Sequence, residues 1–94
     1  MPLNPANREQ VRLSLLRYLD AAAAGAPGRG IPSAVLRQHL RGDGWDIDVP
    51  ETEAELLYLA DKGLVLHAAK AVSPEMLTWR ITAAGRDEYA KTVA

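Results

Sequence analysis

The pattern of apolar and polar positions changes its period at Gly63. Before this glycine, three apolar residues lie seven positions before, three after and four after Leu56, which places all four on one face of a helix. They are Val49, Leu56, Leu59 and Ala60. After it, residues 64–69 and 77–82 form two short β-prone runs separated by a segment with Ser73 and Pro74. We therefore expect a helix that stops at Gly63 and a β-hairpin with Ser73 and Pro74 in its loop.

The first part of the chain predicts a long helix. Asn4 can cap it and Pro5 suits its first turn, because that position needs no backbone donor. Its apolar stripe consists of Val11, Leu15, Tyr18, Leu19 and Ala22. Gly25 ends this helix, and the glycine-rich segment 25–30 reads as a connector.

The next residues predict a helix pair that begins after a very short strand. Ile31 precedes a proline and is expected to pair with the hairpin, whereas a second helix starts at Pro32 and Ser33 and breaks at Gly42. Asp48 and Glu51 are three residues apart, so Asp48 is expected to cap the third helix near Val49.

Angular positions along the third helix divide its residues into two faces. Val49, Thr52, Leu59 and Ala60 are placed inward. Six residues are placed outward, namely Glu51, Ala54, Glu55, Tyr58, Asp61 and Lys62. This placement predicts that the exposed face of the helix is mostly acidic.

The second hairpin strand and the segment after it complete the predicted order. Leu77, Trp79 and Ile81 alternate with polar residues, so one strand face is expected to pack on the helices. Thr82 is expected to cap a last helix over residues 83–92, whose Tyr89 and Val93 can pack on the body or on another copy.

Length and composition bound the class of protein. The 94 residues are enough for a single domain, which we expect to span residues 1–94. Hydrophobic residues make up 48% of the chain, as in ordinary globular proteins. The absence of cysteine excludes a disulfide framework. No apolar run approaches the length of a membrane span, and the N-terminus does not resemble a signal peptide, so we expect a cytoplasmic protein.

Enzyme chemistry finds little support in the residue types. His39 and His67 are the two histidines, and neither has the spacing of a metal site or a catalytic triad. The acids between Asp43 and Glu55 lack the register of a calcium-binding loop. We expect a protein that is not an enzyme and needs no cofactor and no metal.

The net charge of −1 conceals an uneven distribution. Residues 1–41 carry six arginines against two acids, and residues 62–94 carry five basic side chains against three acids. Residues 42–61 hold seven acids and no lysine or arginine. The acidic segment therefore coincides with the third helix and the turn before it.

Two local patterns give the predicted order a family resemblance. One is Leu56-x-x-Leu59-x-x-x-Gly63-Leu64-Val65, and the other is Trp79-Arg80-Ile81-Thr82-x-x-Gly85-Arg86. With the order helix, short strand, helix, helix, hairpin, helix, they cover nearly the whole chain, which resembles a winged helix-turn-helix domain. The resemblance implies an α+β, mostly helical fold with a three-helix core, a β-hairpin wing and a C-terminal helix.

What the resemblance implies about function is binding to duplex DNA, with the third helix in the major groove and the wing against the backbone. Phosphate contacts are expected from Arg37, Arg41, Lys70 and Arg80. Base contacts on the third helix are expected from Thr52, Glu55 and Tyr58. The leading hypothesis is a transcriptional regulator of bacterial or phage type that acts as a homodimer.

The acidic segment supports an alternative. In that hypothesis, the domain binds a basic protein partner, or another copy of itself, through Glu51, Glu55 and Tyr58 and does not bind DNA. By contrast, Arg8, Arg12 and Arg17 are interpreted as a solvated face of the first helix.

Overall fold

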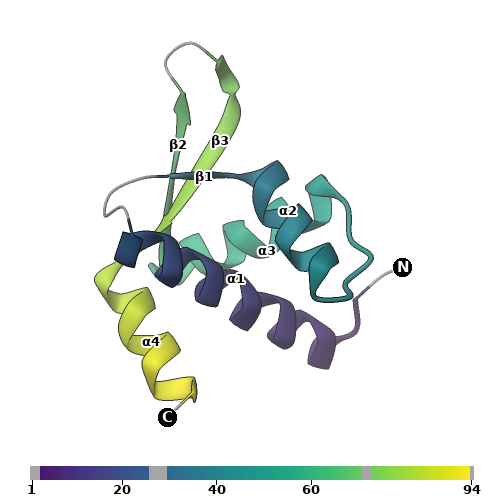
Figure 1. Ribbon diagram of the computed structural model, residues 1–94, viewed down its shortest axis with the longest axis vertical. Coiled ribbons are helices and arrows are strands. Elements are labelled where there is room, and N and C mark those ends of the chain that lie inside the picture. The colour runs from purple at the N-terminus through teal and green to yellow at the C-terminus, as the bar shows by residue number, and fades with distance from the viewer. Residues whose placement is uncertain (1–2, 26–29, 71–72, 94) are drawn as a thin grey trace.

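The computed structural model describes residues 3–25, 30–70 and 73–93, without the side chains of residues 68–70 and 73–76. Within these described residues, four helices surround the base of a three-stranded sheet, and the β2–β3 hairpin extends away from them (Figure 1). The elements in chain order are α1 (Pro5–Gly25), β1 (Ile31–Pro32), α2 (Ser33–Gly42), α3 (Val49–Asp61), β2 (Val65–Lys70), β3 (Ser73–Ile81) and α4 (Ala83–Val93). This is the order that the sequence predicts.

Side-chain caps fix the starts of three helices where the sequence predicts them. Asn4 Oδ1 accepts from the backbone N–H of Asn7 at 2.8 Å, and Asp48 Oδ1 accepts from that of Glu51 at 2.8 Å. Thr82 Oγ1 accepts from the N–H of Gly85 at 3.0 Å at the start of α4. Local capping chemistry therefore defines α1, α3 and α4.

The sheet has the order β1-β3-β2, and both pairings are antiparallel. Ile31 pairs with Trp79, which confirms the predicted contact between the short strand and the hairpin. The predicted loop position of Ser73 and Pro74 is wrong, because both residues belong to β3. The hairpin pairing continues beyond the alternating run, as far as Lys70 opposite Ser73.

The core lies where α1, α2 and α3 meet the base of the hairpin. Its largest side chain is Trp79, which is fully buried, as the strand alternation predicts. The indole N–H of Trp79 donates to Ser33 Oγ at 2.8 Å, and that hydroxyl donates to Glu53 Oε2 at 2.8 Å. A chain of two hydrogen bonds therefore joins β3, α2 and α3.

The last helix packs very closely on Leu64, the residue just before β2. A Cβ atom added to Gly85 would overlap the carbonyl of Leu64 and lie 2.7 Å from Ile81 Cγ1. The Leu64 carbonyl also accepts from the N–H of Thr82, and Thr82 Oγ1 donates to the carbonyl of Gly63. Glycine at position 85 allows α4 to pack at this junction.

None of the helices in the described part of the chain is long and apolar enough to cross a membrane.

Candidate nucleic-acid interface

Helix α3 divides into a buried face and an exposed face. Thr52, Leu56 and Leu59 are almost completely buried against the core. Four exposed residues follow one another along the opposite side at helical spacing, namely Pro50, Ala54, Leu57 and Asp61. The exposed face therefore holds three apolar residues and one acid, and the prediction of a mostly acidic face is wrong.

Glu55 lies on the buried side of α3 rather than in solvent. Its side chain is 9% exposed, and its Oε1 accepts from Arg12 Nε at 2.8 Å. The predicted outward position of Glu55 is therefore wrong, and so is the interpretation of Arg12 as part of a solvated face. The partner on α1 stands 43 positions earlier in the chain, so helical spacing within α3 gives no sign of it.

Thr52 is fully buried, as its angular position predicts. Its hydroxyl donates to the carbonyl of Asp48 at 2.8 Å within the first turn of α3. Because Thr52 and Glu55 both belong to the interior, neither offers a polar atom to a base edge, and the base contacts predicted for them do not fit the structure.

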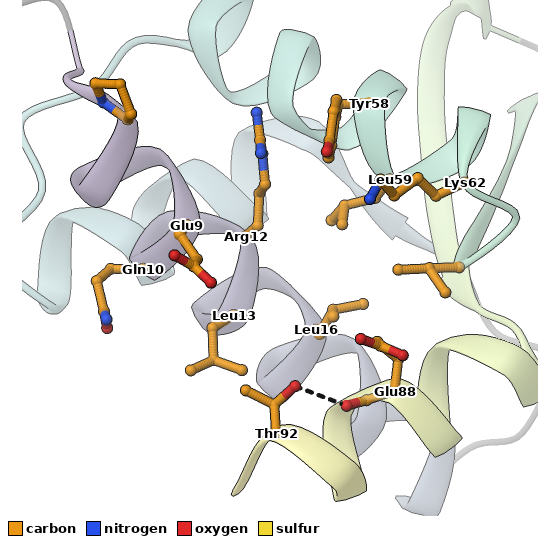
Figure 2. A pocket seen from close by; sticks show the side chains of 12 residues that line it. Glu9, Gln10, Arg12, Leu13, Leu16, Tyr58, Leu59, Lys62, Glu88 and Thr92 are labelled. Atoms are coloured by element: carbon orange, nitrogen blue, oxygen red, sulfur yellow. Dashed lines mark hydrogen bonds between the residues drawn. The ribbon is translucent and has the colours of Figure 1, made fainter.

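Tyr58 is 39% exposed and lies at the margin of the exposed face. The guanidinium carbon of Arg12 is 3.5 Å from its ring centroid, and Lys62 Nζ is 5.2 Å from that centroid. Figure 2 shows Tyr58 beside Arg12, above Leu59 and Lys62. The two cations hold the ring at this margin. Pro50, Ala54 and Leu57 therefore form the centre of the exposed face.

Several other acids of the segment 42–61 have structural partners. Glu53 accepts from Ser33 Oγ, and Asp48 caps α3. Asp43 accepts from Arg17 Nη2 and from the Tyr18 hydroxyl, each at 2.8 Å. The interaction with Tyr18, and next the negative charge of Asp43, raise the pKa of Arg17 above its ordinary value. Many of the carboxylates of this segment therefore interact with other residues of the domain itself.

The basic residues predicted to contact phosphates flank α3 on two elements. Arg37 and Arg41 lie on α2, where Arg37 Nε donates to the carbonyl of Ile47 at 3.4 Å before α3 begins. Arg80 is exposed on β3, opposite the exposed Leu66 of β2. The side chain of Lys70 lies outside the described residues.

Arg8 is a further basic residue beside this face, and the sequence interpretation missed its position. It lines a hollow of about 140 Å³ together with Leu3, Glu51, Ala54 and Glu55. Arg8 and Arg12 are four residues apart, so both lie on the side of α1 that faces α3. That spacing is the signal in the sequence that could have associated Arg8 with α3.

A larger groove of about 420 Å³ lies between α1, α4 and the end of α3 (Figure 2). Its walls combine apolar side chains such as Leu13 and Leu16 with charged ones such as Glu9, Lys62 and Glu88. Over residues 3–25, 30–70 and 73–93, no group of three or more histidine, aspartate or glutamate side chains is arranged to hold a metal ion.

Two solved structures share this fold. A variant of S. aureus MepR bound to an oligodeoxyribonucleotide aligns with a TM-score of 0.69 and 18% identity, over 88% of this chain and 55% of that one. The transcriptional repressor CouR, bound to a 23-mer DNA duplex, aligns with a TM-score of 0.66 and 23% identity, over 96% of this chain and 52% of that one. These likenesses confirm the winged-helix fold.

The chain spans about half the length of the two solved chains. No protein-family model matches it, and the search of curated proteins finds no match.

Proposed function

We propose that this winged-helix chain is a DNA-binding transcriptional regulator. The observation that carries the proposal is the exposed face of α3 in a fold whose solved neighbours are bound to DNA. In winged-helix proteins the corresponding helix enters the major groove and the wing reaches the adjacent backbone. The same placement would bring Pro50, Ala54 and Leu57 of α3 to the base edges.

The distribution of charge supports contact with phosphates on both sides of α3. Arg41 on α2 and Arg80 on β3 are exposed, and no ion pair with either is found among the described residues. Arg37 and Arg8 add two further guanidinium groups near the N-terminal half of the same helix. The ion pair of Arg12 with Glu55 neutralises one carboxylate that would otherwise repel the phosphates of DNA.

A fluorescence anisotropy titration with random-sequence duplex DNA tests this function. If Arg37, Arg41 and Arg80 each contact a phosphate, the logarithm of the association constant should fall against the logarithm of salt concentration with a slope of about −3 for each bound copy of the chain. A lack of binding at about 50 mM salt, where such contacts contribute more than at physiological salt, would overturn the proposal.

The regulator that we propose acts in the cytoplasm. We also propose that it is a homodimer, because two-fold symmetric binding to two half-sites is a common arrangement for helix-turn-helix proteins. Val93 at the end of α4 is 56% exposed and is available for contact with a second copy. Light scattering during size-exclusion chromatography measures the mass in solution, and a monomer at every concentration would contradict the homodimer.

A further inference from the structure

The exposed face of α3 has an apolar centre. Leu57 is 46% exposed, and Ala54 and Pro50 precede it on the same line of the helix at intervals of three and four residues. A leucine that is half exposed in the middle of a helix gains little from the core of its own domain. Its position instead makes it available to whatever the helix contacts.

The polar side chains of the same helix are directed elsewhere. Thr52 is fully buried and Glu55 is bound to Arg12, as described above. Glu53 accepts a hydrogen bond from Ser33, and Tyr58 is held against Arg12 and Lys62. Glu51 is only partly exposed and lines the hollow that Arg8 also lines. From Pro50 to Leu57, the positions that are fully exposed therefore carry no hydrogen-bonding side chain.

An apolar helix face can still read sequence in the major groove. Thymine presents its C5 methyl group there, whereas each of the other three bases presents only hydrogen-bonding groups and ring atoms. Small apolar side chains recognise that methyl group by direct contact. We propose that Ala54 and Leu57 recognise thymine methyl groups and so select A·T base pairs in the bound site. This inference rests on the proposed function, because it requires α3 to lie in the major groove.

Deoxyuridine provides a direct test, because it differs from thymidine by that one methyl group. A pool of random duplexes is enriched on the protein, and the recovered duplex is then made in two forms. One form contains thymine, and the other contains uracil at every thymine position. We expect the uracil form to bind more weakly by about fourfold for each methyl group contacted, which corresponds to the burial of one methylene-sized group.

Variants of Leu57 assign the effect to this residue. Leu57→Ser should lower the ratio of the two affinities by about fourfold, because the contact made by Ala54 remains, and Leu57→Met should preserve the ratio, because methionine restores the apolar contact. Val35→Ser is the matched control, since Val35 is also an exposed apolar residue, at 37%, but lies on α2 and has no proposed contact with a base. Both Leu57 and Val35 lie at the surface, and circular dichroism checks that each variant is folded.

The outcomes separate the inference from the function on which it rests. Equal affinities for the thymine and uracil forms would overturn methyl recognition while leaving DNA binding intact. An unchanged ratio in folded Leu57→Ser would overturn the assignment to Leu57. No enrichment and no binding of either form would overturn both the inference and the proposed function, and would leave a protein as the occupant of this face.

Discussion

Arg12 Nε lies 2.8 Å from Glu55 Oε1, and this ion pair joins the middle of α1 to the buried side of α3. The same guanidinium covers the ring of Tyr58 one turn further along α3. One side chain on α1 thus contacts two neighbouring positions of the helix that we place in the major groove. Its loss should affect the stability of the domain more than the loss of an exposed arginine.

Arg12→Ala should lower the free energy of unfolding by about 2 to 3 kcal/mol, because it leaves the nearly buried Glu55 carboxylate without its charged partner. The matched control is Arg17→Ala, whose ion pair with Asp43 is more exposed, at 51% and 25%, and which should cost at most about 1 kcal/mol. Urea unfolding of both variants measures the difference. Equal losses would show that burial does not distinguish the two pairs.

Ser33→Ala should destabilise the domain by about 1 to 3 kcal/mol, since it leaves the indole N–H of the buried Trp79 without an acceptor. Thr92→Ala removes a hydroxyl that donates to the Glu88 carbonyl at the exposed end of α4, and should change stability by less than about 0.5 kcal/mol. Thermal unfolding followed by circular dichroism gives both values. A stable Ser33→Ala variant would contradict the role assigned to the hydrogen bond.

Gly85→Ala should cost at least about 1 to 3 kcal/mol, because the added methyl group overlaps the Leu64 carbonyl and approaches Ile81. At Gly42, nothing lies within 4 Å of an added Cβ atom, so Gly42→Ala should be neutral or slightly stabilising. Denaturant midpoints of the two variants test the packing of α4. If both substitutions are tolerated equally, α4 does not pack at this distance in solution.

Arg80→Ala should reduce the salt slope of DNA binding by about 1 for each bound copy, because the phosphate contact that we propose for Arg80 would be lost. Arg86→Ala is the control for a basic residue away from α3. Arg86 lies on α4, and its Nε is 3.5 Å from Asp20 Oδ1. Its slope should equal that of the native chain. Anisotropy titrations over a series of salt concentrations supply the slopes, and an unchanged slope for Arg80→Ala would remove β3 from the interface.

The sequence predicts the helices and their order well because the signals that define them are local. The caps at Asn4, Asp48 and Thr82 act within three residues, and each is found as expected. Gly63 has the positive φ of 76° that lets the chain leave α3, and its position in the sequence marks that end directly. The alternation that buries Trp79 also depends on adjacent residues.

The character of the α3 surface could not be predicted in the same way. An angular placement counts turns of one helix, whereas the burial of Glu55 depends on an arginine of another helix. The hydrogen bonds from Trp79 to Ser33 and from Ser33 to Glu53 also join residues that are distant in the chain, 46 and 20 positions apart. Tertiary partners therefore decided which polar groups remain available on α3.

The hydrogen-bond chain through Ser33 has a structural consequence. A serine hydroxyl has one proton, so accepting from Trp79 while donating to Glu53 gives the chain a fixed direction from wing to α3. A hydroxyl proton turned toward Glu53 leaves the lone pairs of the same oxygen available to the indole. The base of the wing and the first turns of α3 are therefore joined through a single hydroxyl orientation, so loss of this hydroxyl would disconnect both elements at once.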